Sequence, residues 1–532
     1  MTRVGIYGWG VVAPRSPDID AFATNLDAAD SWLTPFNGFG TSNFLAGEPA
    51  FRFADYREWI AARFPPRRFA QLEEKMDSPS LYAIGAFIQG LRQNPGLETT
   101  LQELGQQAHV YVGTGLGNIG KLYDASIELH HAQRRWDRFW SEPERNSVLR
   151  KHLAAHGSDP VEGVPQAPAA AAAHADPDAR EAAVHVWQRY WADRSPELAQ
   201  YLAALAAIEK TSITGSVESG KVHVIRARDA MRNKLQQQWG APDAPWEVSA
   251  DVVWNLHNTP AAQVSMLGNI TGLAFSPVAA CSTFGVALKL GMDAIMRGEA
   301  KAVVVGATDP PPHPLIVGGF FSARVLAADG RVSLPLTRLQ GTHVAGGSVV
   351  WILGDYDYMT ARGYRVLGME PIAVGVSSDA DHIITPTIAG PTAAIEQAFA
   401  AANAGPGDIG TWDLHATATP GDYNEVKLLR SALPPTVLGT ARKGTFGHGM
   451  SAGSGWELTA QYLGFARGKL YPTALPASAL NPAIEALHGS FVLDKACAAP
   501  QGLAGKLSLG VGGINACVIS RPWPADNATT GS

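Results

Sequence analysis

The stretch Leu273-Ala274-Phe275-Ser276-Pro277-Val278-Ala279-Ala280-Cys281-Ser282-Thr283 joins a run typical of a β-strand to a run typical of an α-helix. Pro277 to Ala280 is expected to end a buried strand. Apolar residues then recur at helical spacing from Leu288 to Met296, and this helix is expected to stop at Gly298. Another strand is expected over 301–306. Such alternation, repeated along the chain, predicts an α/β fold with a largely parallel sheet.

Cys281 lies in the turn between this strand and this helix. The positive end of a helix favours the thiolate over the thiol, and the thiolate is the nucleophilic form. Small residues on both sides permit a tight turn and the close approach of a substrate. From position alone, a buried and inert cysteine is an equal alternative. The other two cysteines, Cys497 and Cys517, lack this context.

Two histidines follow strands in the second half of the chain. His415 comes directly after a strand expected at 412–414, and His448 comes five residues after Lys443, just before a helix expected at 456–465. A core histidine is normally packed by large apolar side chains, whereas Gly, Ala and Thr surround these two. The pattern therefore predicts a ligand crevice at the carboxyl ends of the strands.

The composition is that of a globular protein. The 532 residues are 46% hydrophobic and 17% charged, with a net charge of −6, so a nucleic-acid partner is not expected. Three scattered cysteines predict neither a disulfide framework nor a metal site, and they favour a reducing cytoplasm. No apolar run is long enough for a membrane span, and the N-terminus does not read as a secretory signal.

A helical segment interrupts the α/β pattern between residues 121 and 247. Two tryptophan pairs in it, 136 with 140 and 187 with 191, are four residues apart, so each pair shares a helix face. They are expected to form a small helical core, with an exposed docking face for a partner as the alternative. The predicted organisation is a first half at 1–120 and 248–355, an insertion at 121–247, a second half at 364–523 and a disordered tail at 524–532.

Residues Gly115 to Gly120 satisfy the spacing G-x-G-x-x-G after a strand-like run. In a dinucleotide-binding unit a second strand and an acidic residue would follow, but here the helical segment follows instead. We therefore expect a structural glycine turn.

Four motifs resemble those of the β-ketoacyl synthases, the thiolase-fold condensing enzymes of fatty acid and polyketide synthesis. They are Ala280-Cys281-Ser282-Thr283, His415 to Asp422, Lys443 to His448, and Leu509 to Asn515. The resemblance covers everything except about 121–247. It implies a thiolase-like fold of two related halves, joined near 355–363, with a large helical insertion in the first half.

The resemblance also implies an activity, the decarboxylative Claisen condensation of a Cys-bound acyl chain with malonyl-acyl carrier protein. Cys281 would accept the acyl chain, and His415 and His448 would stabilise the malonyl enolate as neutral donors. Lys443 would order the histidines, with Glu425 in support. The backbone N–H of Cys281 and one N–H from the closing-strand residues Val511, Gly512 and Gly513 would form the oxyanion hole. The residues implied for substrate binding are Thr417, Thr419, Phe284, Phe320 and Val511.

No resident cofactor is implied, because phosphopantetheine arrives on the carrier protein. A homodimer is implied, or a heterodimer with a ketosynthase-like subunit. Phe284 stands where the family usually has Gly or Ser, and Leu509 and Val511 replace two phenylalanines, so a specialised polyketide, polyene or fatty acid pathway is expected. The alternatives are a non-elongating acyltransferase and a chain-length-factor-like structural subunit. The presence of both histidines, the lysine and the cysteine favours the synthase.

Overall fold

The computed structural model describes residues 2–168, 176–212, 217–383 and 387–524. It divides into two compact units, one formed by 1–121 and 253–532 and the other by 122–252. The second unit extends five residues beyond the predicted insertion. Most of the predicted tail, from residue 525 onward, lies outside the described residues.

The first sheet of the main unit belongs to the first half of the chain. Its strand order is β1 (Val4–Val12), β7 (Gly347–Asp355), β6 (Ala302–Asp309), β4 (Ala108–Gly113) and β5 (Ala274–Phe275). The strands β6, β4 and β5 run parallel, but β7 is antiparallel to both β6 and β1. The strands β1, β6, β4 and β5 therefore point the same way and β7 is reversed, so the sheet is largely parallel, as expected, with one antiparallel strand.

Helices cover both faces of this sheet, which explains why its long strands are buried at every position. Successive residues of β6 alternate between two apolar clusters. One cluster contains residues of α14 (Thr283–Met296), and the other contains residues of α4 (Ser78–Arg92).

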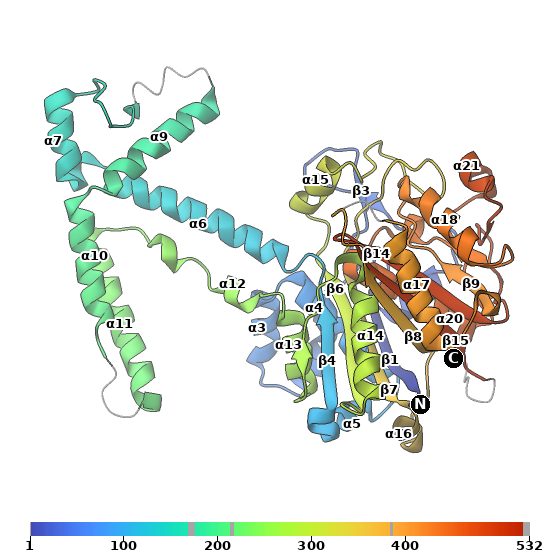
Figure 1. Ribbon diagram of the computed structural model, residues 1–532. Helices are drawn as coiled ribbons and strands as arrows, with labels where there is room; N and C mark the ends of the chain where they lie inside the picture. The colour runs from blue at the N-terminus through green and yellow to red at the C-terminus, as the bar shows by residue number, and fades with distance from the viewer. Residues whose placement is uncertain (1, 169–175, 213–216, 384–386, 525–532) are drawn as a thin grey trace. The chain divides into compact units, whose positions relative to one another are not determined.

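The second sheet belongs to the second half. Its order is β12 (Ser490–Phe491), β10 (Leu438–Thr440), β9 (Ile409–Asp413), β14 (Leu503–Gly510), β15 (Ile514–Pro522) and β8 (Met369–Ser378). The outer face of β8 and β15 carries α17 (Ala389–Ala402). Between the two sheets, α14 packs against α20 (Met450–Ala466), and both helices contact strands of both halves (Figure 1).

The expected strand at 277–280 does not form. The strand β5 ends at Phe275, and the chain then runs irregularly to Cys281. Pro277 has no N–H to give to a neighbouring strand, and the N–H of Ala279 donates to Thr283 Oγ1 at 2.9 Å. The nucleophile turn is thus longer than the pattern indicated.

The second unit is helical, with α6 (Ile119–Trp140) entering it and α7 (Ser147–His156), α9 (Pro177–Ala192), α10 (Pro196–Glu209) and α11 (Val217–Trp239) following. Trp136 and Trp140 are buried with Tyr201, and Trp187 and Trp191 are buried with Leu149. The prediction of an aromatic helical core is confirmed. All members of both clusters belong to this unit, so these tryptophans stabilise it from within.

The chain leaves and re-enters the main unit at one place. Asn118 Nδ2 donates to the carbonyls of Asn255 and Leu256, at 3.0 and 3.1 Å. The N–H of Asp77 donates to Asn255 Oδ1, and the N–H of Lys121 donates to Asp77 Oδ2. These bonds fasten residues on both sides of the insertion to each other. None of the helices in the described ranges has the length and hydropathy of a membrane span.

Candidate active site

Cys281 lies in a single 3-10 turn, η5 (Ala280–Ser282), directly before α14. Ala280 adopts a φ of +48°, a conformation that L-residues rarely take. Ser282 Oγ donates to the carbonyls of Ile514 and Ser508, at 2.8 and 3.2 Å. These bonds hold the turn against the closing hairpin of β14 and β15.

The thiol of Cys281 is buried, and burial raises its pKa to about 11. The positive charge of Lys443 and the backbone N–H of Val511 act in the opposite direction but do not outweigh burial. The expectation of a thiolate favoured by the helix terminus is therefore wrong for the resting chain. At neutral pH the sulfur carries its proton.

The closing turn supplies one backbone donor to this sulfur. The N–H of Val511 faces Cys281, whereas the N–H of Gly512 donates to Ile383 O at 2.7 Å and that of Gly513 donates to Gly510 O at 3.0 Å. Of the three candidate donors Val511, Gly512 and Gly513, Val511 is the one whose N–H faces the sulfur. The φ angles of Gly512 and Gly513, +90° and +73°, shape the turn that presents Val511.

The two imidazoles lie edge to face. Their ring centroids are 5.4 Å apart, with 82° between the ring planes. The backbone N–H of His415 donates to Glu425 Oε1 at 2.6 Å, and the backbone N–H of His448 donates to His343 O at 2.7 Å. Within the described chain neither Nδ1 atom has a hydrogen-bond partner, although both are buried. The rings retain hydrogen-bonding capacity for a ligand.

Both rings are neutral. Burial lowers the pKa of His415 well below its usual range, and Lys443, His448 and Lys506 lower it further. Burial is also the main cause of the lowered pKa of His448, followed by the two lysines. The predicted neutral donors agree with these directions, but burial and not the helix terminus dominates.

Lys443 is buried and pairs with Glu457. Its Nζ lies 2.7 Å from Glu457 Oε1 and donates to His415 O at 2.5 Å. The predicted support from Glu425 takes another form, since Glu425 accepts the N–H groups of His415 and Ala416. Burial raises the pKa of Glu425 to about 7.

A further set of buried charges adjoins this pair. Lys506 Nζ lies 2.8 Å from Glu457 Oε2 and 3.6 Å from Asp413 Oδ1, and Arg442 Nε lies 3.3 Å from Asp413 Oδ2. Sequence reasoning did not identify Glu457, Lys506, Asp413 or Arg442 as site residues. The available signal was a charged residue within an otherwise apolar element, as for Lys506 in β14 and Glu457 in α20.

The remaining predicted substrate residues lie in different surroundings. Thr417 and Thr419 are half-buried, and their hydroxyl oxygens are 2.9 Å apart. Phe284 is fully buried against Trp351, with ring centroids 4.9 Å apart, so its ring is part of the core, and its contact with substrate stays a prediction. Phe320, in α15 (Pro314–Ser322), packs on an apolar cluster that includes Met450.

The glycine motif at 115–120 forms a turn around a carboxylate of the chain itself. Asp309 Oδ1 accepts the N–H groups of Gly115 and Leu116, at 3.0 and 2.8 Å, and the hydroxyl of Thr114. Its Oδ2 accepts the N–H of Ser451 at 2.7 Å. These amides already bind an internal anion, in agreement with a structural turn.

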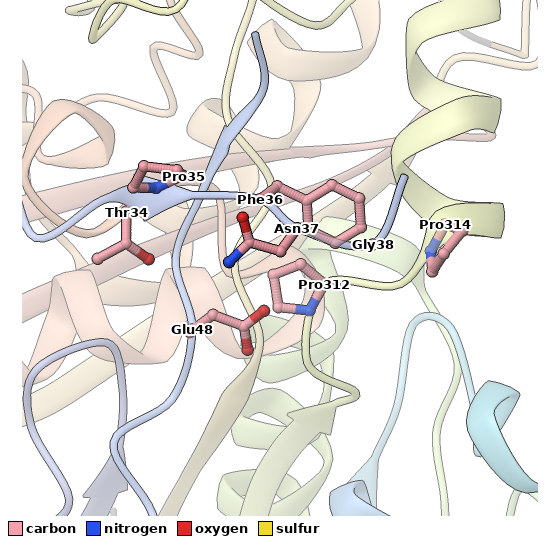
Figure 2. A pocket seen from close by; sticks show the side chains of 8 residues that line it. All are labelled: Thr34, Pro35, Phe36, Asn37, Gly38, Glu48, Pro312 and Pro314. Carbon is pink, nitrogen blue, oxygen red and sulfur yellow. The ribbon is translucent and has the colours of Figure 1, made fainter. Parts of the chain in front are cut away.

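A cavity of about 620 Å³ is lined by Thr34, Pro35, Phe36, Asn37, Gly38, Glu48, Pro312 and Pro314 (Figure 2). Glu48 is the one titratable side chain in this lining, and burial raises the pKa of its carboxyl. None of the predicted site residues lines the cavity. The lining contains no cysteine, so this cavity does not include the candidate nucleophile Cys281.

The comparisons with known proteins assign the family. Residues 196–357 match the β-ketoacyl synthase N-terminal domain, and residues 371–475 match its C-terminal domain. The chain belongs to the β-ketoacyl synthase family. The second match includes His415, Lys443 and His448, and the first includes Cys281.

Curated relatives of this synthase family are distant. Nodulation protein E of Rhizobium meliloti is 29% identical over 218 residues, which is 40% of this chain and 54% of that protein. A 3-oxoacyl-[acyl-carrier-protein] synthase homolog of Saccharomyces cerevisiae is 29% identical over 282 residues, 50% of this chain and 63% of that protein. The chain thus matches little more than half the length of these relatives.

Solved structures share the synthase fold along nearly the whole chain. The ishigamide ketosynthase/chain length factor has a TM-score of 0.66 at 17% identity, and a β-ketoacyl synthase from Burkholderia phymatum has a TM-score of 0.64 at 17% identity. Each alignment covers 98% of this chain and 100% of the other. At this identity the likeness shows the thiolase-like fold.

Proposed function

We propose that this chain is a β-ketoacyl synthase that condenses an acyl chain on Cys281 with malonyl-acyl carrier protein and releases CO2. The observation that carries the proposal is the pair of buried, neutral imidazoles of His415 and His448, in the same unit as a cysteine that faces a backbone donor. Claisen chemistry requires a nucleophile that can hold an acyl group and donors for an enolate oxygen.

The first step is transfer of the acyl group to sulfur. Cys281 Sγ attacks the carrier thioester, and the N–H groups of Cys281 and Val511 stabilise the oxyanion. The bond between the carbonyl carbon and the carrier sulfur then breaks, and the phosphopantetheine thiol leaves with the proton lost by Cys281. Because one thiol replaces another, no net proton is consumed, and the product is an uncharged thioester suited to a buried site.

The second step forms the carbon nucleophile. The malonyl thioester oxygen accepts hydrogen bonds from His415 and His448, the bond to the carboxylate carbon breaks, and its electrons form an enolate as CO2 leaves. Neutral donors stabilise the developing charge on oxygen without a salt bridge to the carboxylate that must depart. The enolate carbon then attacks the carbonyl carbon of the Cys281 thioester, the bond from that carbon to sulfur breaks, and sulfur leaves as a thiolate that takes one proton from water.

The partners and the setting are part of the same proposal. The carrier protein would deliver both substrates, so that no resident cofactor is needed, and Thr417 and Thr419 would hydrogen-bond the phosphopantetheine arm. The chain would act in the cytoplasm as a homodimer, or as a heterodimer with a ketosynthase-like subunit. The aliphatic residues Leu509 and Val511 in the closing hairpin favour a specialised polyketide, polyene or fatty acid pathway over housekeeping synthesis.

The test is intact-protein mass spectrometry after incubation with a panel of acyl carrier protein thioesters, followed by malonyl-carrier protein. Wild type is compared with Cys281→Ala and with Cys497→Ala, a matched loss of a cysteine outside the site. We expect a Cys281-dependent acyl adduct that disappears as an extended β-ketoacyl product forms. An adduct that never extends would indicate a non-elongating acyltransferase, and no adduct with any chain would indicate a structural subunit.

A further inference from the structure

A second buried lysine, Lys506, lies in the charged cluster next to the histidines. It is fully buried in β14, where its Nζ donates to Leu507 O at 2.7 Å and to Leu414 O at 3.3 Å. The ammonium also pairs with Glu457 and Asp413. Burying an ion pair brings little stability compared with apolar residues of similar size. Stability alone therefore does not account for a lysine at this position.

The contacts of Lys506 connect it to the segment that carries His415. Glu457 shares its carboxylate between two lysines, with Oε1 at 2.7 Å from Lys443 and Oε2 at 2.8 Å from Lys506. The two ammonium groups in turn bind consecutive carbonyls, Lys443 that of His415 and Lys506 that of Leu414. One carboxylate thus holds both lysines, and both lysines hold the backbone at the end of β9.

The cluster also carries an excess of positive charge. Its directly paired members are three cations, Arg442, Lys443 and Lys506, against two carboxylates, Asp413 and Glu457, and all five side chains are at most 2% exposed. Charges in such surroundings are weakly screened. A positive excess disfavours a proton on either imidazole.

We propose that Lys506 is a positioning residue for the condensation proposed above: it fixes the backbone that carries His415 and adds to the effect of burial that keeps both imidazoles neutral. The inference rests on the proposed function only for its catalytic meaning, since the placement and the charge state of the rings can be measured without turnover. It is supported by the lowering of the pKa of both histidines, in which burial is followed by Lys443 and Lys506 among the causes.

Several other titratable or charged groups surround the histidines and Lys506, and all remain in place in the variants below. They are Asp413 on β9, Asp422 and Glu425 on α18 (Gly421–Ala432), Arg442 and Lys443 before His448, Glu457 on α20, Cys281 at η5 and Cys517 on β15.

The experiment compares wild type with Lys506→Met, Lys506→Gln and Lys506→Arg. The Gln variant retains a donor for Leu414 O without the charge, and the Arg variant retains the charge. Lys301→Met is the matched control, because Lys301 pairs with Asp355 at 2.6 Å but is partly exposed and distant in sequence from the site. Two readouts are taken for each: the pH profile of malonyl-carrier decarboxylation, and NMR titration of 13C-labelled histidine rings assigned with His415→Gln and His448→Gln.

We expect the acid limb of the decarboxylation profile, and the onset of protonation of both rings, to move to higher pH by about one unit in the Met and Gln variants. The Arg variant and Lys301→Met should shift neither the acid limb nor the protonation of the rings. If Lys506→Gln shifts neither the acid limb of the decarboxylation profile nor the titration of the histidine rings, the inference is overturned and Lys506 is a purely structural residue. If the Met variant does not fold, the Gln and Arg pair decides. If wild type does not decarboxylate malonyl-carrier protein, the proposed function fails, and the ring titrations still decide the role of Lys506.

Discussion

Alkylation of Cys281 should accelerate steadily with pH, without a plateau near neutrality. Burial raises the pKa of its thiol from 9.0 to about 11, a difference equivalent to about 3 kcal/mol. At pH 8 only about one molecule in a thousand would then carry the thiolate. Since the thiolate is the reactive form, the alkylation rate should rise about tenfold for each pH unit between pH 7 and pH 10.

The assay is a short reaction with iodoacetamide at several pH values, followed by peptide mass spectrometry. The peptide that contains the partly exposed Cys497 is the internal reference in every digest. Lys443→Met removes the positive charge that most opposes the effect of burial. This variant should therefore slow Cys281 alkylation by about tenfold at each pH, while the surface variant Lys301→Met should not.

A rate that levels off near pH 7 would refute the reasoning, because it would show that the thiolate already exists at neutrality. The helix terminus at α14 would then outweigh burial, as the sequence alone suggested. An unchanged rate in Lys443→Met would refute a narrower point, the electrostatic coupling between Lys443 and the sulfur.

Two further predictions concern stability. Trp140→Ala should destabilise the 122–252 unit by about 3–5 kcal/mol, because loss of the buried ring leaves a cavity beside Trp136 and Tyr201. The control Leu202→Ala, on the exposed face of α10, should change stability by less than about 0.5 kcal/mol. Equal thermal transitions for both variants would contradict this prediction. Burial raises the pKa of Glu425 from 4.5 to about 7. The folded chain therefore holds the proton of this carboxyl group more tightly than the unfolded chain does, and wild type should lose stability as pH rises from about 4.5 to about 7. Glu425→Gln should lack that loss, and a difference in melting temperature that stays constant with pH would count against it.

The positions of the main catalytic candidates could be predicted because each lies at an end of an element that periodicity identifies. A strand before His415 and a helix after Cys281 place both residues where chains turn, and the structure has these turns. The partners of the same residues could not be predicted. The spacing does not show that Lys443 pairs with Glu457 and not with Glu425. This choice depends on how α20 packs against strands of both sheets.

The details that the residue pattern left open depend on direction and not on position. Gly512 and Gly513 are in the expected turn, but their N–H groups point to Ile383 and Gly510, and the remaining donor is Val511. Phe284 follows the nucleophile turn as expected, but its ring points toward Trp351 in the core. Backbone angles and side-chain rotamers decide such directions, and a residue pattern does not contain them.

The hydrogen bonds that join Asn118 to Asn255 and Leu256 hold the two ends of the insertion close together, so the insertion could be removed or replaced as one cassette. Because the main unit itself holds the two ends together, a short linker in place of 122–252 would have to close only a small gap, and closing a short loop carries a small entropic penalty. The same junction is a graft point, at which helical cassettes of different length could be exchanged without altering the residues that surround Cys281.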